Sequence, residues 1–462
     1  MNTPAPLQPQ DLYLPCPPED LPFETTDELP DLDKVLGQPR ALQALELGSE
    51  VQGPGFNIFV AGLPDSGRTT LTREYLERKA AAESVPDDWC YVFNFKDPHR
   101  PRAINLPAGQ AVRLRDEMQQ LVQRCQDEIR RVFASEEYNQ ERNRLGQSMQ
   151  SAQEQEFQKL VAEAQSVGFT IARTPTGISL IPLQQNGQPL PPEAYEKLPA
   201  EQKERLRQTE SQLQLKTQAT LRRIKEIGEA AFRQLQELDA QTARFALQHI
   251  FEALSERYQE YPKVQAHLQA VQEDMVQNVD ILRGESESPM PLQQWLSRYD
   301  VNVLVDNSHL QGAPVVMESH PTYQNLVGRI EHRLVMGVTQ THFTMIRPGA
   351  LHRANGGYLL LPARDILVNP YAWQGLERAL RDGEIRILEL GSQMGMLTTV
   401  SLEPEPIPLR VKVVLFGTSQ LHEMLRELDV DFGKLFKVRA QFASTMERTP
   451  ENIADYSLFI KS

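Results

Sequence analysis

The chain has 462 residues, and its 48 Lys and Arg against 62 Asp and Glu give a formal net charge of −14. That acidic balance argues against a general nucleic-acid-binding protein, which needs a basic face. No run of about 18 apolar residues is present, so no membrane-spanning helix is predicted, and the first residues lack the basic and apolar stretches of a signal peptide. Cys16, Cys90 and Cys125 lie far apart, which predicts no disulfide scaffold or zinc site and favours a reducing cytoplasm.

Residues 1–35 differ in composition from the rest of the chain. They hold eight prolines and eight acidic residues against one base, Lys34, and so carry −7 of the net charge. Because proline fixes φ and removes a backbone donor, we expect an extended arm and not a domain. The arm would lie along a neighbouring surface or subunit, although a solvated tail explains the composition equally well.

Residues 36–107 alternate between helix and strand patterns. Apolar residues at helical spacing predict helices over 36–51 and 69–82, and short apolar runs predict buried strands at 56–62 and 89–95. A strand, a glycine-containing loop, a helix and another strand are the start of an α/β unit with a parallel sheet.

Residues 108–295 have a different pattern, which predicts an insertion into that α/β unit. Two long stretches carry apolar residues every three or four positions, mostly with Gln, Glu, Arg and Lys between them. This spacing predicts an antiparallel helical hairpin or coiled coil. Between the two stretches, residues 168–192 alternate apolar and polar residues and contain turn signals at 175–177 and 186–187. We expect a small β-hairpin there, at the tip of the coiled coil.

The α/β pattern returns in residues 296–446, with strands predicted at 298–308, 356–362 and 411–419 and a helix at 371–387. The predicted fold class is therefore α/β. It is a P-loop NTPase-like parallel sheet interrupted by a long α-helical coiled-coil insertion that carries a small β-hairpin.

A phosphate-binding loop is predicted at GLPDSGRT, residues 62–69. The segment matches G-x-x-x-x-G-K-[ST] except that Arg68 replaces the lysine. In such a loop the glycines let main-chain N–H groups surround phosphate oxygens, the cation reaches the β- and γ-phosphates, and the hydroxyl binds Mg²⁺. Gly62, Gly67 and Thr69 keep these places between a predicted strand and a predicted helix. A glycine-rich turn without a ligand is the alternative interpretation.

Two features of the loop predict weakened ATP binding. Arg68 is bulkier than lysine and carries its charge in a planar fork, so the two cations are not equivalent at a tight phosphate site. Asp65 adds a carboxylate that would repel phosphate unless it points outward.

The residues that hydrolysis needs are incomplete. A second apolar strand should end in Asp for Mg²⁺ and Glu for the attacking water, but Pro362 and Ala363 stand where those acids are expected. Asp365 follows, and it would either reach the site or serve as an acid in the first turn of a helix. Thr418 ends the third strand, where these ATPases place a residue that senses the γ-phosphate. A threonine that only terminates the strand explains Thr418 equally well.

Several longer sequence segments identify a protein family more specifically than the phosphate-loop motif does. They are GQPRALQALELG (37–48), FNIFVAGLPDSGRTT (56–70), PTYQNLVGRIEH (321–332), RPGALHRANGGYLLLPARDIL (347–367) and ELDVDFGKLFKVRAQF (427–442). Together they resemble the Lon-related AAA+ proteins, Lon-like ATP-dependent proteases with a long helical insertion in the ATPase domain, over about 37–462. The resemblance implies an AAA+-like core in two parts, 36–107 and 296–446, around the insertion 108–295, with the start of a lid in 447–462.

The resemblance also implies partners. Members of the family form ring-shaped hexamers that capture proteins and thread them toward Ser–Lys protease domains. An arginine of one subunit completes the next subunit's site, and Arg439 or Lys437 is the matching residue here; a solvated charge at a strand end is the alternative. An arginine in the phosphate loop, here Arg68, is another point of resemblance to the family. Relatives usually carry Asp where this chain has Pro362, so the chain departs from the family there. Some relatives with degenerate ATPase motifs degrade unfolded proteins without ATP, and Arg68 with Pro362 points in that direction.

The predicted site is a weakened ATP and Mg²⁺ site without catalytic residues. Its nucleotide-binding residues are Gly62, Asp65, Ser66, Gly67, Arg68, Thr69, Thr70, Thr418 and Arg439, and the Thr69 hydroxyl is the metal ligand. The resemblance stops where relatives begin the lid, before the Ser–Lys protease domain. We therefore expect no peptidase site in this chain and weak or absent ATP hydrolysis.

The leading hypothesis is the ATPase-like, substrate-handling part of a Lon-related protease, either driven by ATP or acting as a nucleotide-independent scaffold. The alternative is a non-enzymatic coiled-coil interaction protein on a decayed NTPase core. In that case apolar residues of the predicted hairpin would grip an unfolded protein or a partner, unless they pack the hairpin against the helices. These residues are Phe169, Ile171, Ile178, Leu180 and Ile181. The acidic charge disfavours a third hypothesis, a DNA-linked AAA+ activator.

Overall fold

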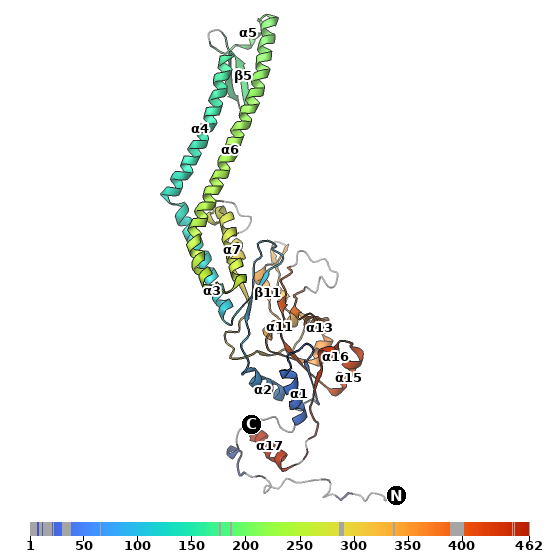
Figure 1. Cartoon of the computed structure of the whole chain (residues 1–462). Coiled ribbons are helices and arrows are strands. Elements are labelled where there is room, and N and C mark those ends of the chain that lie inside the picture. The colour runs from blue at the N-terminus through green and yellow to red at the C-terminus, as the bar shows by residue number, and fades with distance from the viewer. Residues whose placement is uncertain are drawn as a thin grey trace. The chain divides into compact units, whose positions relative to one another are not determined.

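The computed structural model describes residues 7–8, 12, 21, 23–29, 38–64, 66–174, 177–184, 187–285, 291–335, 338–388, 402–445, 447 and 449–461. Asp65, most of the predicted arm and the predicted turn residues 175–176 and 186 lie outside them. The chain folds as two compact units, an α/β unit from Met1–Met118 with Arg298–Ser462 and a helical unit from Gln119–Ser297 (Figure 1). The segment boundaries expected from the sequence stay predictions.

A five-stranded parallel sheet forms the centre of the α/β unit. In sheet order its strands are β16 (Val438–Gln441), β1 (Ile58–Ala61), β15 (Lys412–Gly417), β12 (Tyr358–Pro362) and β7 (Val315–Met317). Successive side chains of β1 enter two separate apolar clusters, Phe59 one of them and Ile58 and Val60 the other. Because successive side chains of a strand point to opposite faces, both faces of the sheet are buried. The predicted α/β fold class is confirmed.

The remaining elements of the α/β unit are short. Its helices are α1 (Pro39–Glu50), α2 (Arg68–Ala80), α10 (Tyr323–Val327), α11 (Ala350–Arg353), α12 (Ala363–Val368), α13 (Ala372–Asp382), α15 (Ser419–Leu428), α16 (Phe432–Leu435) and α17 (Pro450–Lys461). Two-stranded pairs are β8 (Arg329–Ile330) with β11 (Ile346–Arg347), β9 (Arg333–Val335) with β10 (Val338–Gln340), and β13 (Glu384–Ile385) with β14 (Ile407–Pro408). Proline opens α1 and Gly383 closes α13, because proline lacks the donor that a first turn leaves unused and glycine adopts a positive φ.

Two predicted strands belong to a different sheet from the one expected. β2 (Asp88–Val92) pairs antiparallel with both β3 (Arg102–Leu106) and β6 (Val301–Val305). The prediction that the strand at 89–95 continues the parallel sheet is therefore wrong. A parallel connection needs a crossover of a dozen or more residues, and the link from β2 to β3 is shorter than that.

The helical unit contains long helices and a small hairpin. Its elements are α3 (Gln110–Phe133, which belongs to this unit from Gln119), α4 (Glu136–Ser166), β4 (Phe169–Thr174), β5 (Gly177–Pro182), α5 (Pro192–Glu196), α6 (Ala200–Arg257), α7 (Pro262–Gln277), α8 (Val279–Arg283) and α9 (Leu292–Leu296). α4 and α6 run side by side (Figure 1), and Arg223 Nη1 of α6 lies 3.9 Å from Glu156 Oε2 of α4. No described helix is both long and apolar enough to cross a bilayer.

The predicted hairpin is present, since β4 pairs antiparallel with β5. Phe169 is buried with Ala164 of α4 and Leu213 of α6, while Ile171 and Leu180 pack against the same cluster. These apolar side chains therefore attach the hairpin to the two helices. These three residues therefore pack the hairpin against the helices, and they are not exposed to bind an unfolded protein.

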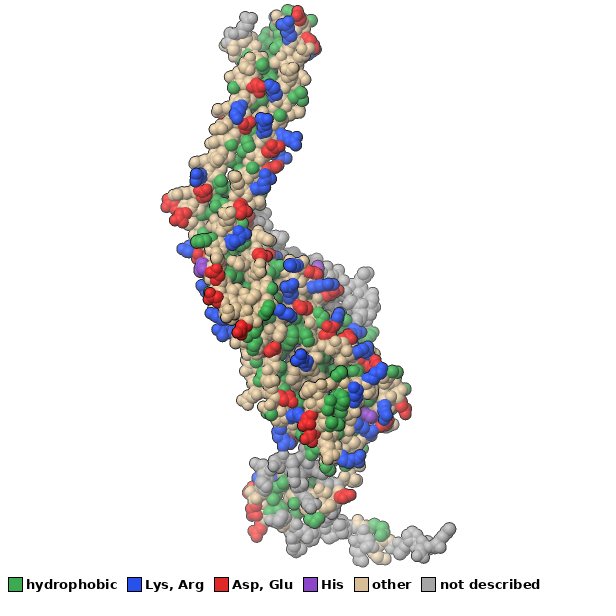
Figure 2. All heavy atoms as spheres, viewed as in Figure 1, with side chains coloured by type: hydrophobic (Ala, Val, Ile, Leu, Met, Phe, Trp, Pro, Cys, Tyr) green, Lys and Arg blue, Asp and Glu red, His purple; other side chains and the backbone are tan. Residues whose placement is uncertain are grey.

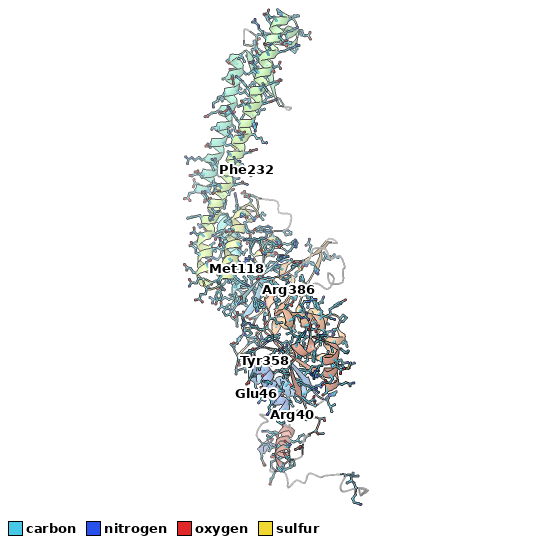
Figure 3. The ribbon with its side chains drawn as sticks, turned by 45° about the vertical axis from the view of Figure 1, so that its right-hand side comes forward. Arg40, Glu46, Met118, Phe232, Tyr358 and Arg386 are labelled. Carbon is cyan, nitrogen blue, oxygen red and sulfur yellow. The ribbon has the colours of Figure 1, made fainter. Side chains whose placement is uncertain are left out.

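Two phenylalanines of α6 are exposed. Phe232 is 62% exposed and Phe245 is 80% exposed, and Figure 3 labels Phe232 on this helix. In the sequence both are among the apolar residues at helical spacing in 206–254, which predicts the apolar face of a helix; for these two residues that prediction is wrong. The adjacent small residues Ala231 and Ala246 occupy the buried side instead. Spacing of three and four does not distinguish a phenylalanine from its neighbouring alanine when both are apolar.

A buried arginine links four helices of this unit. The Arg283 guanidinium lies 4.3 Å from the ring centroid of Phe133 and 5.4 Å from that of Tyr138. Tyr138 Oη donates to Asp239 Oδ1 at 2.6 Å, and Arg283 lies 3.9 Å from the other oxygen of Asp239. The free-energy cost of burying the Arg283 guanidinium is therefore offset by a nearby carboxylate and by two aromatic rings.

An acid pair in the α/β unit joins α13 to the segment after α15. Glu377 shares a hydrogen bond with Asp429, which also accepts Trp373 Nε1 at 2.7 Å. Partial burial, that hydrogen bond and the neighbouring Asp429 raise the pKa of Glu377 to about 7, against the opposing effect of Arg381 and with a smaller contribution from Asp431. Glu377 therefore holds a proton in the folded chain at pH values where the unfolded chain has lost it.

We expect the stability of the α/β unit to decrease as the pH rises from about 4.5 to 7. The folded pKa of Glu377 is raised, so its contribution is complete below the unfolded value and is lost as the pH passes the folded value of about 7. Glu377→Gln stays neutral and should be more stable than the parent at pH 8, but not at pH 4, by about 1 kcal/mol, since partial exposure screens the pair. Urea denaturation at both pH values measures this, with the exposed Glu427→Gln as control. Equal pH profiles of parent and Glu377→Gln would contradict it.

Candidate phosphate-loop site

The predicted phosphate loop connects β1 to α2 at the carboxyl edge of the parallel sheet. β1 lies between β15 and β16, two strands that come much later in the chain, so the strand order reverses at β1. Ligands of open α/β sheets bind at the carboxyl ends of the strands at such a switch point. Gly62 N donates to Gly417 O at 3.2 Å, which holds the start of the loop against the end of β15.

The local structure explains why glycine occupies positions 62 and 67 of the loop. Gly67 precedes α2 with a φ of 70°, in the left-handed region that other residues rarely adopt. A Cβ on Gly62 would lie 3.0 Å from the Phe442 Cβ and 3.3 Å from the Ser66 Oγ. Ser66 Oγ in turn donates to Leu63 O at 2.9 Å. A positive φ therefore favours glycine at position 67 and a close neighbour favours it at position 62, while the phosphate-binding role of the segment stays a prediction.

Arg68 occupies an unexpected place. The sequence assigned its charge to the phosphates of a nucleotide, but its Nη1 donates to the main-chain oxygens of Gly62 and Gly417. The guanidinium thus connects the carboxyl ends of β1 and β15. Partial burial lowers its pKa from the ordinary value, although an arginine stays charged in proteins.

Thr69 is the residue predicted to bind Mg²⁺, and its role as a metal ligand stays a prediction. Thr69 is half-buried in the first turn of α2, and Thr70 is exposed. Pro362 ends β12 and Ala363 is buried, while Asp365 lies in the first turn of α12. Among the residues that the structure describes, no group of three or more His, Cys, Asp or Glu could hold a metal ion.

Thr418 follows the carboxyl end of β15, whereas Arg439 lies within β16, level with Phe59 of β1. Thr418 is the N-cap of α15, and its Oγ1 accepts Leu421 N at 3.2 Å. Arg439 of β16 donates from Nε and Nη2 to Gln441 Oε1, at 3.1 and 2.7 Å, and from Nη1 to Glu423. Arg439 is thus held within its own chain, and its service to a neighbouring subunit stays a prediction. Lys437, the other candidate, donates to Pro54 O.

Two family models match this chain. One is described as a LonB-like AAA domain and matches residues 311–443, and the other is described as a Lon-like LonC helical domain and matches residues 88–121. These two matches support a Lon-related AAA+ family for the chain.

The other comparisons add little to this assignment. Among solved structures, the chain is similar to NtrX from Brucella abortus, with 18% identity over 31% of this chain and 32% of that chain and a TM-score of 0.20. So low a TM-score carries no argument about fold or function. None of the curated proteins compared matches the chain.

The two matches cover different parts of the chain. AAA domains bind nucleotides in general, and the LonB-like match contains β7, β12, β15 and β16 with Thr418 and Arg439. The loop at 62–69 lies outside both matched segments. Its assignment as a phosphate loop therefore depends on its own geometry and its place in the sheet.

Sequence reasoning missed several polar residues at this edge. Gln441 accepts both Arg439 and Ser419 Oγ, the latter at 2.9 Å. Glu318 follows β7 and binds Arg353 Nη2 at 3.1 Å. A polar residue directly after an apolar strand is the signal that would have found Glu318. One partner of Gln441, Arg439, lies in the same strand and the other, Ser419, begins α15, so spacing along the chain does not show the cluster.

Proposed function

We propose that this chain is the AAA+-like, substrate-handling part of a Lon-related ATP-dependent serine protease. The observation that carries the proposal is a loop with the glycine spacing of a phosphate loop, after the second strand of a five-stranded parallel sheet, in a chain that matches LonB-like and LonC models. In this role the chain assembles into a homohexameric ring in the cytoplasm and captures unfolded or misfolded proteins. The proposal assigns no peptide-bond chemistry to residues of this chain.

Nucleotide binding is a weakened part of the proposed role. Gly67, with its positive φ at the start of α2, supports the binding of a nucleoside triphosphate, because this backbone conformation lets a main chain curve around phosphate. Arg68 on two carbonyls and Pro362 in place of an acid argue against efficient hydrolysis. We therefore propose that ATP binds weakly and is turned over slowly or not at all.

Capture of an unfolded protein tests the role. We expect the full chain to bind a fluorescent, reduced and carboxymethylated reporter protein in a saturable way, measured by anisotropy, and to leave the folded reporter unbound. Sedimentation velocity should show a species of about six times the 52.5 kDa of one chain. A monomer that binds neither form of the reporter would contradict the proposal.

A scaffold or interaction protein without nucleotide dependence is the second candidate, and the exposed Phe232 and Phe245 favour it. Large apolar side chains on a surface often mark a binding site. In this case the double variant Phe232→Ser, Phe245→Ser should abolish capture, while Arg233→Ser with Arg244→Ser on the same helix should not. Capture that survives both pairs of substitutions assigns binding to the AAA+ core.

A further inference from the structure

The paired helices α4 and α6 are well packed at both ends of the pair and poorly packed between them. On α4, Tyr138 is buried near the start and further residues are buried from Leu160 onward, but none is buried in 139–159, all of which the structure describes. On α6, only Ala231 is buried among the described residues 218–242. We call these two ranges the middle span. Little buried apolar surface holds the two helices together there.

Both ends of the pair are fixed by buried contacts. At one end, Arg283 contacts Tyr138 of α4 and Asp239 of α6, and these three residues are named the Arg283 cluster. At the other end, Phe169 of the hairpin is buried in one cluster with Leu213 of α6. Beyond Asp239 the buried residues of α6 are Ala243, Ala246, Leu247, Ile250, Phe251 and Leu254. The middle span therefore joins two well-packed parts of one unit.

Each helix has a glycine within the middle span. A Cβ on Gly146 of α4 would meet nothing within 4 Å, and a Cβ on Gly228 of α6 would lie 3.3 Å from Gln153 Nε2 of α4. That amide donates to Ile224 O at 3.3 Å, the oxygen that accepts Gly228 N in a regular helix. Glycine weakens the interior of a helix, and a side chain that bonds to the main-chain ladder is a known cause of bending.

The exposure of Phe232 shows that the two helices are open here. Phe232 lies two turns before Asp239 and so on the side of α6 that contacts Tyr138 of α4. It is nevertheless 62% exposed (Figure 3). α4 therefore does not cover this side of α6 at the level of Phe232, which leaves room for the angle between the helices to change.

We propose that the middle span is a hinge, centred on Gly146 and Gly228, about which the hairpin of β4 and β5 moves relative to the Arg283 cluster. Motion is expected where few apolar side chains are buried, because little packing has to be broken. Collective hinge motions take microseconds to milliseconds. The hinge goes beyond the proposed function and does not depend on it, since it requires neither a nucleotide nor a captured protein.

Hydrogen exchange of the full chain tests where the hinge lies. We expect amides of 218–242 to exchange at least tenfold faster than those of the packed residues 243–254 of the same helix, because the middle span opens locally. Exchange at one uniform rate along α6 overturns the proposal.

Stiffening the two glycines tests their role. Gly146→Ala with Gly228→Ala should slow exchange of the middle span by about fivefold, since alanine is the better helix former and only the end of a flexible side chain lies close to either added Cβ. Gly433→Ala in α16, where an added Cβ also meets nothing within 4 Å, is the matched control and should leave exchange of α4 and α6 unchanged. Equal exchange in the parent and the double variant overturns the proposal.

Distances between spin labels separate bending from a simple gain in helix stability. Ala219→Cys and Arg244→Cys place two labels at exposed positions on one side of α6, about 38 Å apart at about 1.5 Å per residue. Cys16→Ser removes the cysteine of the N-terminal arm, and Cys90 and Cys125 are buried. Because both labels lie off the helix axis on the same side, bending changes their separation.

We expect the distance distribution of the parent chain to be about twice as wide as that of the double variant Gly146→Ala, Gly228→Ala, measured by pulsed electron paramagnetic resonance. Gly433→Ala should keep the width of the parent. A narrow distribution in the parent, equal to that of the double variant, overturns the hinge even if exchange has slowed.

Discussion

The Gly349→Ala chain should lose about 3 kcal/mol or more of stability, the largest single effect expected here. A Cβ at this position would lie within 2.5 Å of Gly328 N and of the carbonyl carbon of Leu326. Both neighbours are main-chain atoms, so no side chain can rotate away and the segment between α10 and β8 must move. Overpacking of this kind is among the few mechanisms that produce large losses. Urea denaturation followed by circular dichroism measures the loss.

Gly433→Ala is the matched control for that substitution. Gly433 lies in α16 with nothing within 4 Å of an added Cβ. Alanine there should leave stability unchanged or raise it by up to about 1 kcal/mol, since glycine is the weaker helix former. If the two variants unfold at the same denaturant concentration, the close approach at Gly349 does not exist.

Asn57→Leu should cost about 2–4 kcal/mol. The Asn57 side chain is buried, its Nδ2 donates to Leu435 O at 2.8 Å, and its Oδ1 accepts Val413 N at 2.9 Å. One amide thus holds the start of β1 against β15 and against the end of α16. Leucine fills a similar volume but leaves the buried Val413 N–H without its acceptor, and an unsatisfied buried group costs about 1–3 kcal/mol. Thermal unfolding monitored by circular dichroism measures the effect.

Asn105→Leu provides the comparison. Asn105 is exposed on β3 and donates only to the Asp87 carboxylate, at 2.8 Å. Loss of an exposed hydrogen bond should change stability by no more than about 0.5 kcal/mol. A loss as large as that of Asn57→Leu would show that amide burial is not the cause.

Burial of the sheet was predictable from the sequence, and strand direction was not. The apolar runs around Phe59, Leu360 and Leu415 predict strands buried on both faces, because each residue type avoids water whichever face it occupies. The run around Tyr91 has the same composition but belongs to an antiparallel sheet. Direction depends on the length of the connection and on the partner strand, and the composition of a strand contains neither.

The candidate site likewise has features that the sequence predicts and features that it does not. Gly62 and Gly67 follow from the motif, since close approach and positive φ are local demands of the loop. The place of Arg68 does not, because its acceptor Gly417 lies 349 positions further along the chain. The motif says what a cation at this position does when phosphate is present. The main-chain oxygens that accept the Arg68 guanidinium in this structure lie next to each other only because β1 and β15 pair in the sheet.

The position of β1 in the sheet bears on how the chain is made. β1 pairs only with β15 and β16, and 378 positions separate Asn57 from Leu435, its hydrogen-bond partner beside β16. At a synthesis rate of about 5–20 residues per second, β1 waits roughly 20–75 s for these partners. During that time an apolar strand and a glycine loop have no sheet to enter. The helical unit, by contrast, finds its contacts within one continuous stretch of chain. A nascent chain of this protein should therefore need protection for its first strand after its insertion has already folded.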